Sequence, residues 1–446
     1  MIIDIPDGVR LILNEMEKSK FECYAVGGAV RDSLEGKIPK DWDFTTNALP
    51  KEILKVFSGY HVFRLGEKFG TISVKIEDKI YEITTYRKDS DYTDFRHPGN
   101  VSFTSSLNED LRRRDFTVNA MAYNDKDGLI DLYGGRSDLE NKILRCVGDP
   151  GQRFSEDALR ILRALRFTSV YKYKIENNTS AALFNQKSLL KCIAAERISA
   201  ELNRILCGEH AAYILKDFQD IIEVIMPEIQ PMIGLTQNNP HHDKDVWQHT
   251  VSAIYNIEPD PLLRITMLLH DIAKPERKTT DRHNIDHFKG HPEFSALTAE
   301  KILKRLKYPS KFIDTVLMLI KYHDIRMGGN SKQIKTILRE IGPDCFGKLL
   351  KVQKADILAQ SLNMREEKLA RLDCTKKVFD SIVKEKQCFS LKDLDIKGSD
   401  LIDMGFTEGK EIGKILNYLL ELTIDNKIQN DKQQLKQIIS SLFTPV

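Results

Sequence analysis

The sequence of 446 residues predicts an α+β protein, in which a small mixed α/β head precedes a chain that is almost entirely helical. Between residues 21 and 136, short runs rich in β-branched and aromatic residues alternate with turns. From about residue 138 onward, apolar residues recur at helical spacing. A cluster of proline and glycine at 227–240 interrupts this helical part and predicts a linker there.

The head is expected to begin with an amphipathic helix within residues 1–20 and to continue as strands. The predicted strands cover 24–26, 42–45, 71–76 and 81–86. The last two are separated by a short polar turn, which predicts a hairpin. The polar segment that follows, 86–100, is expected to form a loop beside the functional site.

Composition restricts the class of protein. Hydrophobic residues make up 41% and charged residues 30% of the chain, and no apolar run reaches the roughly 18 residues that a membrane helix needs. The seven cysteines are dispersed and the N-terminus lacks a signal-peptide pattern, so we expect a cytoplasmic protein with no membrane partner. The net charge is only +2, but residues 141–207 contain twelve basic against six acidic residues, which favours an RNA partner.

One short stretch carries the strongest chemical signal. Residues 27–32 read GGAVRD, and Asp41 and Asp43 follow within a strand-like run. A Gly-Gly turn lets the backbone approach a phosphate, and Arg31 could reach the same group beside Gly28. Two carboxylates at positions i and i+2 of a strand share a face, where they repel unless a divalent cation binds. This combination predicts a nucleoside triphosphate site with Mg²⁺. Glu82, on a neighbouring predicted strand, is either a third carboxylate of this site or an edge-strand surface charge.

The same stretch resembles the catalytic signature of the DNA polymerase beta nucleotidyltransferase superfamily. Residues 111–120 (LRRRDFTVNA) resemble the Arg-Arg-Asp motif of class II tRNA nucleotidyltransferases and bacterial poly(A) polymerases. Residues 156–167 (EDALRILRALRF) resemble the nucleobase-recognition helix of that group. The chain therefore resembles the bacterial CCA-adding tRNA nucleotidyltransferases that carry an HD domain.

This resemblance implies roles for individual residues of the head. Asp41 and Asp43 would bind Mg²⁺ between the triphosphate and the 3′-hydroxyl of the RNA, in a two-metal arrangement. Arg114 would contact the triphosphate or the ribose. Asp115 would orient Arg114 or bond the ribose.

The recognition helix is predicted to begin at Ser155 as its N-cap. Asp157 and Arg160 lie three positions apart and would share one helix face. A carboxylate and a guanidinium together match the Watson–Crick edges of cytosine and adenine, whereas uracil and guanine present the opposite polarity. Arg163 and Arg166 would continue this face and reach the triphosphate.

A second constellation lies in the helical half. Residues 268–274 (LLHDIAK) resemble the signature of HD phosphohydrolases. The candidate ligands of a transition metal such as Ni²⁺, Mn²⁺ or Co²⁺ are His249, His270, Asp271 and Asp356. Asp324 competes with Asp356 for the last position, and three further histidines are additional candidates: His287, His291 and His323.

The resemblance as a whole predicts template-independent addition of CCA to the 3′ end of tRNA from CTP and ATP, with release of pyrophosphate. The expected parts are a nucleotidyltransferase head at 1–137, a helical neck at 138–235, an HD domain at 236–360 and a tRNA-binding helical tail at 361–446. A poly(A) polymerase and an enzyme adding only CC or only A remain alternatives. An HD phosphohydrolase with an RNA-binding head is an alternative from another class. A monomer and a homodimer are equally compatible with the sequence.

Overall fold

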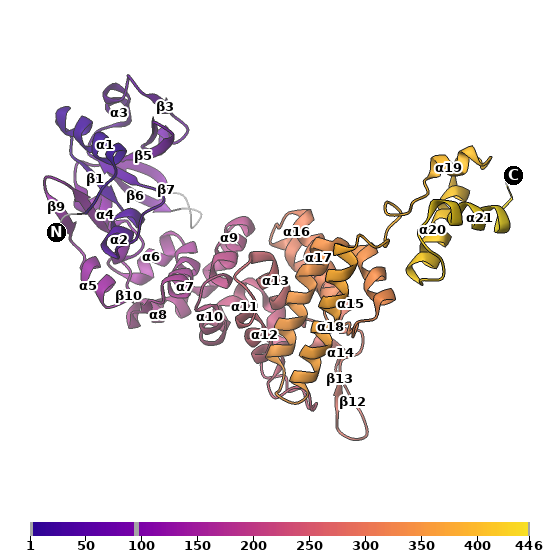
Figure 1. Cartoon of the computed structure of the whole chain (residues 1–446). Helices are drawn as coiled ribbons and strands as arrows, with labels where there is room; N and C mark the ends of the chain where they lie inside the picture. Colours follow the sequence, from indigo (N-terminus) through magenta and orange to yellow (C-terminus); the bar gives the residue numbers. More distant parts are fainter. Residues whose placement is uncertain (1–2, 93–97, 445–446) are drawn as a thin grey trace. The chain divides into compact units, whose positions relative to one another are not determined.

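The computed structural model describes residues 3–92 and 98–444, and of residues 89–92 and 98–101 only the backbone (Figure 1). The described chain divides into two compact units, Met1–Pro227 and Glu228–Val446. The first unit contains the expected α/β head and the helices that follow it, and the second is almost entirely helical. The predicted α+β class, with an α/β head followed by helical regions, is confirmed.

A seven-stranded mixed sheet forms the centre of the head, in the order β3-β4-β5-β2-β1-β8-β9. Its strands are β1 (Cys23–Val26), β2 (Asp43–Thr46), β3 (His61–Phe63), β4 (Thr71–Ile76), β5 (Lys79–Thr85), β8 (Met121–Asn124) and β9 (Gly128–Asp131). All four residues of β1 are buried, and β1 pairs antiparallel with both β2 and β8. Strands β4 and β5 form the predicted antiparallel hairpin. Because β2 pairs in parallel with β5, the first residue of β2, Asp43, lies beside Glu82 in the middle of β5.

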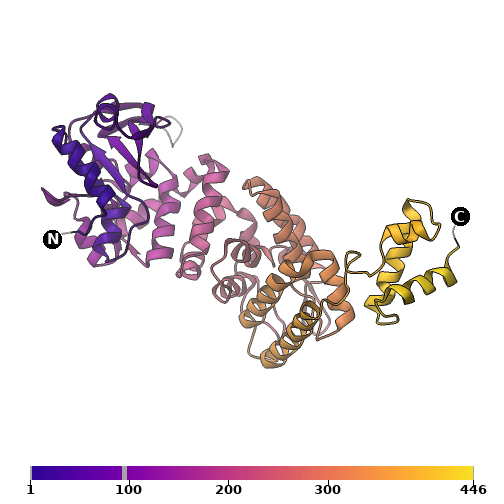
Figure 2. The ribbon, with the colours of Figure 1, turned by 45° about the horizontal axis from the view of Figure 1, so that its top comes forward.

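Short helices cover this sheet: α1 (Asp7–Lys18), α2 (Gly28–Leu34), α3 (Pro50–Val56) and α4 (Leu107–Arg112), with 3-10 turns η1 (Glu67–Phe69) and η2 (Thr117–Asn119). Figure 2 shows α1, in indigo, lying across the strands. The apolar side of α1 is buried through Val9, Ile12, Leu13 and Met16, as the amphipathic pattern predicted.

The polar segment expected as a loop at 86–100 is largely a β-ribbon instead. Strands β6 (Arg87–Tyr92) and β7 (Pro98–Phe103) pair antiparallel as a separate two-stranded sheet. Residues 93–97, the centre of the expected loop, lie outside the described residues. The sequence of this ribbon is mostly polar and lacks the alternation of apolar and polar residues that signals a half-buried strand, which explains why it was not predicted.

The neck helices complete the first unit. They are α5 (Gly135–Glu140), α6 (Pro150–Glu156), α7 (Leu159–Tyr171), α8 (Asn177–Gln186), α9 (Ala195–Leu206), α10 (Ala211–Asp217) and α11 (Gln219–Ile225), with the 3-10 helix η3 (Lys187–Cys192) and a short parallel pair, β10 (Ile143–Leu144) and β11 (Lys174–Ile175). Helix α7 packs against α9 and is buried along most of its length. Helix α7 also contacts the segment before η2, through the aromatic contact of Phe167 with Phe116.

The second unit begins at η4 (Pro227–Met232), within the predicted linker. Its elements are α12 (Val246–Tyr255), α13 (Pro261–Leu269), α14 (Lys274–Arg277), β12 (Thr279–Thr280), β13 (Asp286–His287), α15 (His291–Arg305), α16 (Ser310–Tyr322), α17 (Ser331–Ala359), α18 (Arg365–Lys384), α19 (Gly398–Asp403), α20 (Lys410–Ile424) and α21 (Lys432–Leu442). Helix α17 is kinked at Gly342, which has a φ of 75° and is followed by Pro343. Helices α19–α21 enclose a separate small core around Leu401 and Leu419.

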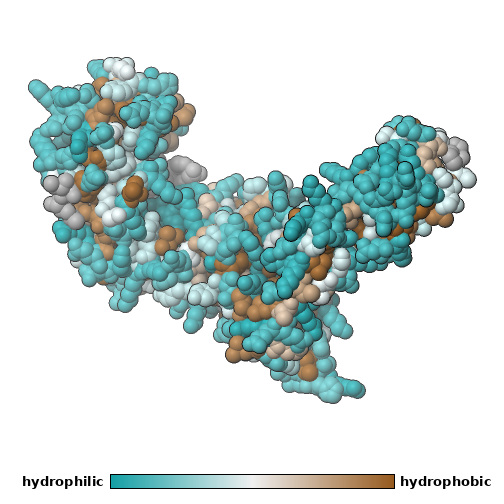
Figure 3. Space-filling view, viewed as in Figure 1, coloured by the Kyte–Doolittle hydropathy of each residue, from teal (hydrophilic) through white to brown (hydrophobic). Residues whose placement is uncertain are grey.

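Hydrophilic residues cover most of the face shown in Figure 3, and hydrophobic residues occur there in scattered patches. Among the described residues, no helix combines the length and the apolar composition needed to cross a bilayer.

Candidate active site and metal centre

Three carboxylates gather where β2 begins. Asp43 is the first residue of β2 and pairs in register with Glu82 of β5, and Asp41 precedes the strand by two residues. Asp41 and Asp43 are exposed on either side of the buried Trp42, so they face the same way, although Asp41 lies before the strand rather than within it. Glu82 was interpreted either as a third carboxylate of the site or as an edge-strand surface charge. Its pairing with Asp43 supports the first interpretation.

The electrostatics of the cluster show mutual repulsion. Partial burial raises the pKa of Asp43, with a further contribution from Asp41 and an opposing one from Arg114. Partial burial also raises the pKa of Glu82, and the charges of Asp43 and Asp41 raise it further. A divalent cation would offset this repulsion. Mg²⁺ prefers oxygen ligands such as carboxylates, so the three carboxylates could hold this ion.

The glycine turn lies beside an arginine, as a phosphate site requires. Gly27 has a φ of +74° and precedes α2, and an added Cβ there would lie 3.3 Å from Nη1 of Arg114. Arg114 also interacts electrostatically with Asp43, so its guanidinium is close to both the turn and the carboxylates. The backbone at Gly27 and Gly28 and the cation at Arg114 can therefore contact one phosphate group.

A buried aspartate that the sequence did not single out holds this arginine. Asp110 of α4 is fully buried and accepts hydrogen bonds from Thr45 at 2.9 Å, from Arg113 at 2.8 Å and from Arg114 at 3.4 Å. Burial opposes ionisation of Asp110, but the two guanidinium groups outweigh it and lower its pKa. Asp110 precedes Arg113 by three residues and Arg114 by four, and this helical spacing could have predicted both ion pairs from the sequence.

Asp110→Ala should destabilise the first unit by about 3–5 kcal/mol, because it removes the carboxylate that compensates buried guanidinium groups. Urea unfolding in a Trp247→Phe background, where Trp42 reports on the head, measures this loss. The pKa of Asp110 is lowered on folding, so the difference from wild type should be full above about pH 4 and fade as the pH falls through the folded-state pKa.

The matched control is Asp125→Ala, which breaks a half-exposed ion pair with Arg10 and should cost less than about 1 kcal/mol. An Asp110→Ala loss no larger than that of the control would contradict the anchoring role.

Asp115 forms a different pair from the one predicted. Its carboxylate accepts from Nε of Arg163 at 2.8 Å and from Asn119 at 3.0 Å, whereas Arg114 bonds Asp110. Burial opposes ionisation of Asp115, but Arg163 and Asn119 lower its pKa well below the usual range. The expectation that Asp115 orients Arg114 is therefore wrong: Asp115 joins the head to α7.

The same network includes Arg31. Its guanidinium donates to Asn119 at 2.6 Å and to the Tyr171 hydroxyl at 3.1 Å, and it pairs with Asp32 at 2.7 Å. It also lies 4.7 Å from the centre of the Tyr171 ring, in a cation–π contact. With 5% of its surface exposed, Arg31 ties α2 to α7 in this structure.

The predicted recognition helix is broken at its start. Helix α6 ends at Glu156, Asp157 is extended with φ −138° and ψ 100°, and α7 begins at Leu159. Ser155 lies inside α6 and donates to Gln152, so the prediction that it is the N-cap is wrong. Asp157 instead accepts from the backbone N–H of Leu159 at 3.1 Å. Asp157 and Arg160 therefore do not share a continuous helix face.

The two predicted base-reading side chains have separate partners. Asp157 accepts from Arg197 of α9 at 3.2 Å, and its side chain is 19% exposed. Arg160 is buried and donates to the backbone oxygen of Arg113 at 2.8 Å and to Glu156 at 3.0 Å. Asp157 is thus the more accessible of the pair.

Arg166, further along α7, pairs with Glu201 of α9 at 2.9 Å. Burial lowers the pKa of Arg166, and Glu201 opposes this shift. Glu201 and Arg197 are the two residues of α9 that hold side chains of the recognition segment. Neither residue could be predicted from the sequence, because only the packing of α9 on α7 brings them there.

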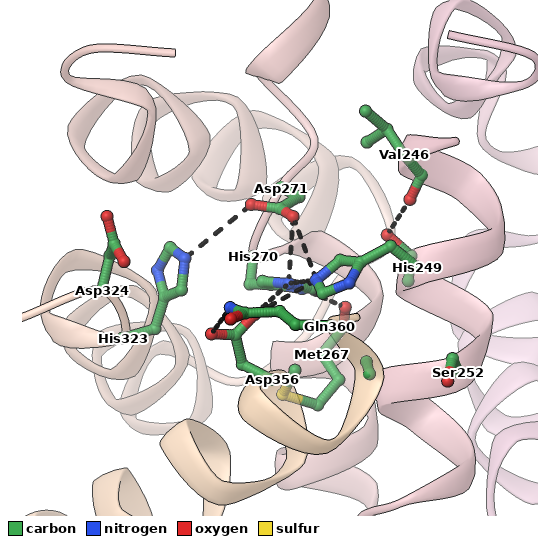
Figure 4. A network of polar contacts seen from close by, with 12 residues as sticks. Val246, His249, Ser252, Met267, His270, Asp271, His323, Asp324, Asp356 and Gln360 are labelled. Atoms are coloured by element: carbon green, nitrogen blue, oxygen red, sulfur yellow. Dashed lines mark hydrogen bonds and ion pairs between the residues drawn. The ribbon is translucent and has the colours of Figure 1, made fainter. Parts of the chain in front are cut away.

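The second unit gathers the predicted HD residues into one buried cluster (Figure 4). His249 of α12 lies 3.3 Å from His270 at the end of α13, measured between their Nε2 atoms. Asp271 lies 3.2 Å from His270 and 3.5 Å from His249, and Asp356 of α17 lies 3.1 Å from His249. The structure therefore brings Asp356 to the first pair of histidines, and Asp324 lies beside His323 instead.

Charges in this cluster favour a cation. Burial opposes ionisation of Asp271 and Asp356, but the surrounding imidazole and cationic groups lower the pKa of both well below the usual range. Burial lowers the pKa of His323 to about 3, aided by His270 and His291. Both oxygens of Asp271 are buried without a hydrogen bond of good geometry, although Lys274 lies 2.7 Å from one of them. Ionised carboxylates beside imidazole nitrogens form a donor set that fits a transition metal.

A cavity of about 380 Å³ opens onto the cluster. Its lining includes Asp271, His291 and His323 together with four cationic side chains: Lys274, Lys289, Arg326 and Lys368. His287 also lines the cavity but bonds Asp281 at 2.9 Å on the β12–β13 hairpin, away from the buried cluster.

Comparisons with known proteins find relatives for both units of the chain. The poly A polymerase head domain matches residues 23–145, the probable RNA- and SrmB-binding site of polymerase A matches 172–233, and a putative domain 2 of tRNA nucleotidyltransferase matches 291–439. The CCA-adding enzyme of Bacillus subtilis (strain 168) is 31% identical over 429 residues, which cover 96% of each chain.

Two solved structures share the fold. The Bacillus stearothermophilus CCA-adding enzyme in complex with CTP has a TM-score of 0.69 at 24% identity, covering 97% of this chain and 96% of that one. The Thermotoga maritima CCA-adding enzyme complexed with tRNA_CCA has a TM-score of 0.59 at 21% identity, covering 98% and 96%. With the carboxylate cluster in place and a relative matched over nearly its full length, the chain belongs to the family of the CCA-adding enzymes.

Proposed function

We propose that the head transfers CMP, CMP and AMP, from CTP and ATP, to the 3′ end of tRNA. The observation that carries this proposal is the cluster of Asp41, Asp43 and Glu82 beside the Gly27 turn and Arg114. Relatives of the same family have been solved with CTP, with ATP and with tRNA, which supports these partners. No disulfide links the cysteines of the described residues, which supports the proposal that the protein acts in the reducing cytoplasm.

The chemistry follows from the positions of these groups. The oxygen of the RNA 3′-hydroxyl bonds to the α-phosphorus and its proton is released to water, while the bond from that phosphorus to the bridging oxygen of the β-phosphate breaks and pyrophosphate leaves with the bonding electrons. Asp41 and Asp43, with Glu82 beside them, would hold Mg²⁺, which lowers the pKa of the hydroxyl and stabilises the leaving oxygen. Arg114 would bind the triphosphate against the Gly27–Gly28 backbone. Arg163 and Arg166, held by Asp115 and Glu201, would extend a cationic surface along α7.

Incubation with tRNA lacking its CCA end, with CTP and ATP supplied singly and together, tests this function. Full CCA addition requires both nucleotides. Addition of CC alone or of A alone would identify a partial enzyme, and a long tail from ATP alone would identify a poly(A) polymerase.

Base choice is proposed to depend on Asp157 and Arg160. Asp157→Ala or Arg160→Ala should admit UTP or GTP and slow addition, because half of the hydrogen-bonding pair is lost. The expected change is about 1–3 kcal/mol, which corresponds to roughly fivefold to 150-fold in selectivity. Asp157→Asn is the sharper variant, because an amide of the same size adds a donor that the carbonyl oxygen of uracil accepts.

Competition of UTP and GTP against CTP in single-turnover addition measures this selectivity. The control is Arg204→Ala, an exposed residue on α9, which should leave base choice unchanged. Unaltered preference for CTP and ATP in both the Asp157 and the Arg160 variants would exclude side-chain templating by this segment.

A second function is proposed for the HD cluster: metal-dependent hydrolysis of phosphate monoesters or cyclic phosphates at RNA ends. The supporting observation is the buried set His249, His270, Asp271 and Asp356 at a cavity with a cationic wall. A bound Ni²⁺, Mn²⁺ or Co²⁺ would activate water and polarise the phosphate. Assays on RNA ending in a 3′-phosphate or a 2′,3′-cyclic phosphate, with each metal supplied, test it.

A further inference from the structure

A second cavity, of about 190 Å³, adjoins the cavity at the HD cluster. The two cavities share three lining residues, His241, Arg326 and Lys368, so they lie next to each other. We call this second space the side cavity. All the residues that line it belong to the second unit, and none of them is a proposed metal ligand. Its role is therefore not explained by the metal centre.

The walls of the side cavity are mainly apolar. Met327 and Ile357 line it from the interior and are buried, Leu372 is partly buried, and Met364 is 44% exposed. Methionine side chains adapt to the shape of a flat ring and make favourable sulfur contacts with aromatic groups. Ligand sites typically combine such apolar walls with a few polar groups that fix the orientation of the ligand. The side cavity therefore suits a flat ring with polar edges.

One buried amide gives the side cavity a hydrogen-bond acceptor. Gln353 of α17 lines the cavity and has only 2% of its surface exposed. Its Nε2 atom donates to the backbone oxygens of Ile325 at 2.7 Å and of Tyr322 at 3.2 Å. These two bonds fix the orientation of the amide, because a carbonyl oxygen cannot donate. Oε1 is therefore the atom of Gln353 that is left to accept a hydrogen bond from a ligand.

The wall between the two cavities is cationic. Arg326 donates to Asp356 of the HD cluster at 2.8 Å, and Asp356 follows Gln353 by three residues on α17. Lys368 of α18 donates to Gln360 at 2.6 Å, and Gln360 in turn donates to Asp356 at 2.9 Å. A ligand whose anionic group lies at the HD cluster could therefore extend past two cations into the side cavity.

His241, at the junction of the cavities, has an unused polar atom. Its Nδ1 is buried without a hydrogen-bond partner in the part of the chain that the structure describes. Burial lowers the pKa of His241, and the charge of Lys368 lowers it further, so the ring is neutral at pH 7. A neutral imidazole has one donor and one acceptor nitrogen. Such a ring suits the hydroxyl groups of a ribose, which separates a phosphate from its base.

We propose that the side cavity binds the base of an RNA 3′-terminal nucleotide whose phosphate lies at the HD cluster, and that Gln353 selects a base with an exocyclic amine. The N4 amine of cytosine or the N6 amine of adenine would donate to Oε1 of Gln353. Uracil has a carbonyl oxygen where cytosine has this amine, so two acceptors would face each other. The inference rests on the proposed phosphohydrolase function for the position of the phosphate, whereas binding of the base can be measured without hydrolysis.

Binding of 3′-CMP and 3′-UMP to the full chain, measured by calorimetry, tests the proposal, because the two nucleotides differ only in the base. We expect 3′-CMP to bind about tenfold more tightly, since uracil leaves a buried acceptor unpaired. Leu372→Trp places a larger side chain in the cavity, so it should weaken 3′-CMP binding by about tenfold and leave binding of inorganic phosphate unchanged. The matched control is Leu362→Trp, at a residue that is 77% exposed and outside the cavity, and it should bind as wild type does.

Hydrolysis by the wild-type chain gives a second measurement that needs no substitution. Cytidine 2′,3′-cyclic phosphate should have a KM about tenfold below that of the uridine compound, with similar kcat. Equal KM values would overturn base selection and leave the phosphohydrolase function intact. Without any hydrolysis that function fails, and the binding data alone decide. Equal binding of 3′-CMP and 3′-UMP, or a preference that persists in Leu372→Trp and so comes from the head, would overturn the side cavity as a base site.

Discussion

Asp41→Ala or Asp43→Ala should reduce CMP addition by about a thousandfold or more. Both carboxylates face the space beside Glu82 and Arg114, where the triphosphate is proposed to bind. Loss of a metal ligand removes several kcal/mol of transition-state stabilisation, and each 1.4 kcal/mol corresponds to about tenfold in rate. Single-turnover addition of CMP to tRNA lacking CCA, at saturating CTP and Mg²⁺, measures the change.

Two further variants make this test specific. Asp78→Ala, in the exposed turn of the β4–β5 hairpin, should keep wild-type addition. Glu82→Gln should give an intermediate loss if Glu82 shares the metal site. Appreciable CMP incorporation by the double variant of Asp41 and Asp43, with tRNA binding unchanged, would refute the carboxylate site.

Combined replacement of His270 and Asp271 by alanine should abolish phosphatase and cyclic phosphodiesterase activity. These residues, which directly follow α13, are proposed metal ligands, and Asp271 faces four imidazoles. Nucleotide addition should change little, because the head carries its own carboxylates. Hydrolysis is measured on 2′,3′-cyclic phosphate RNA with Ni²⁺, Mn²⁺ and Co²⁺ in turn.

The reciprocal control is the Asp41–Asp43 variant, which should lose addition and keep hydrolysis. Wild-type protein stripped by a chelator should lose hydrolysis and regain it on metal addition, a test that needs no substitution in a buried cluster. Absence of bound metal and of hydrolysis with every added ion would show that the HD fold is only a scaffold.

Much of the head was predictable because its signals are local. The strand at 71–76 alternates buried and exposed residues, and the hairpin with 79–85 follows from the short polar turn. The glycine turn and the two aspartates are close in sequence. The i,i+2 spacing of Asp41 and Asp43 alone predicts that these two side chains share a face. The buried β1 was equally clear from its apolar run.

The recognition segment shows where local signals fail. The i,i+3 spacing of Asp157 and Arg160 predicted one helix face, but the chain is extended at Asp157. The backbone there is stabilised by contacts from elsewhere: Arg197 of α9 binds Asp157, and Arg160 bonds the backbone of Arg113. Such long-range contacts outweigh helical propensity, which amounts to less than about 1 kcal/mol per residue.

By itself, the sequence determined the α+β class, the nucleotide-binding motif of the head and the family, because these depend on periodicity and on residues close together in the chain. Only the tertiary structure decided which residues pair across it. In the folded chain Arg114 bonds Asp110, and Arg163 bonds Asp115. Asp356, and not Asp324, contacts the histidine pair His249 and His270. His249 and Asp356 are 107 positions apart, and their contact depends on the packing of α12 against α17. No spacing rule predicts such a contact, because burial of apolar helix faces sets the geometry and the polar cluster follows from it.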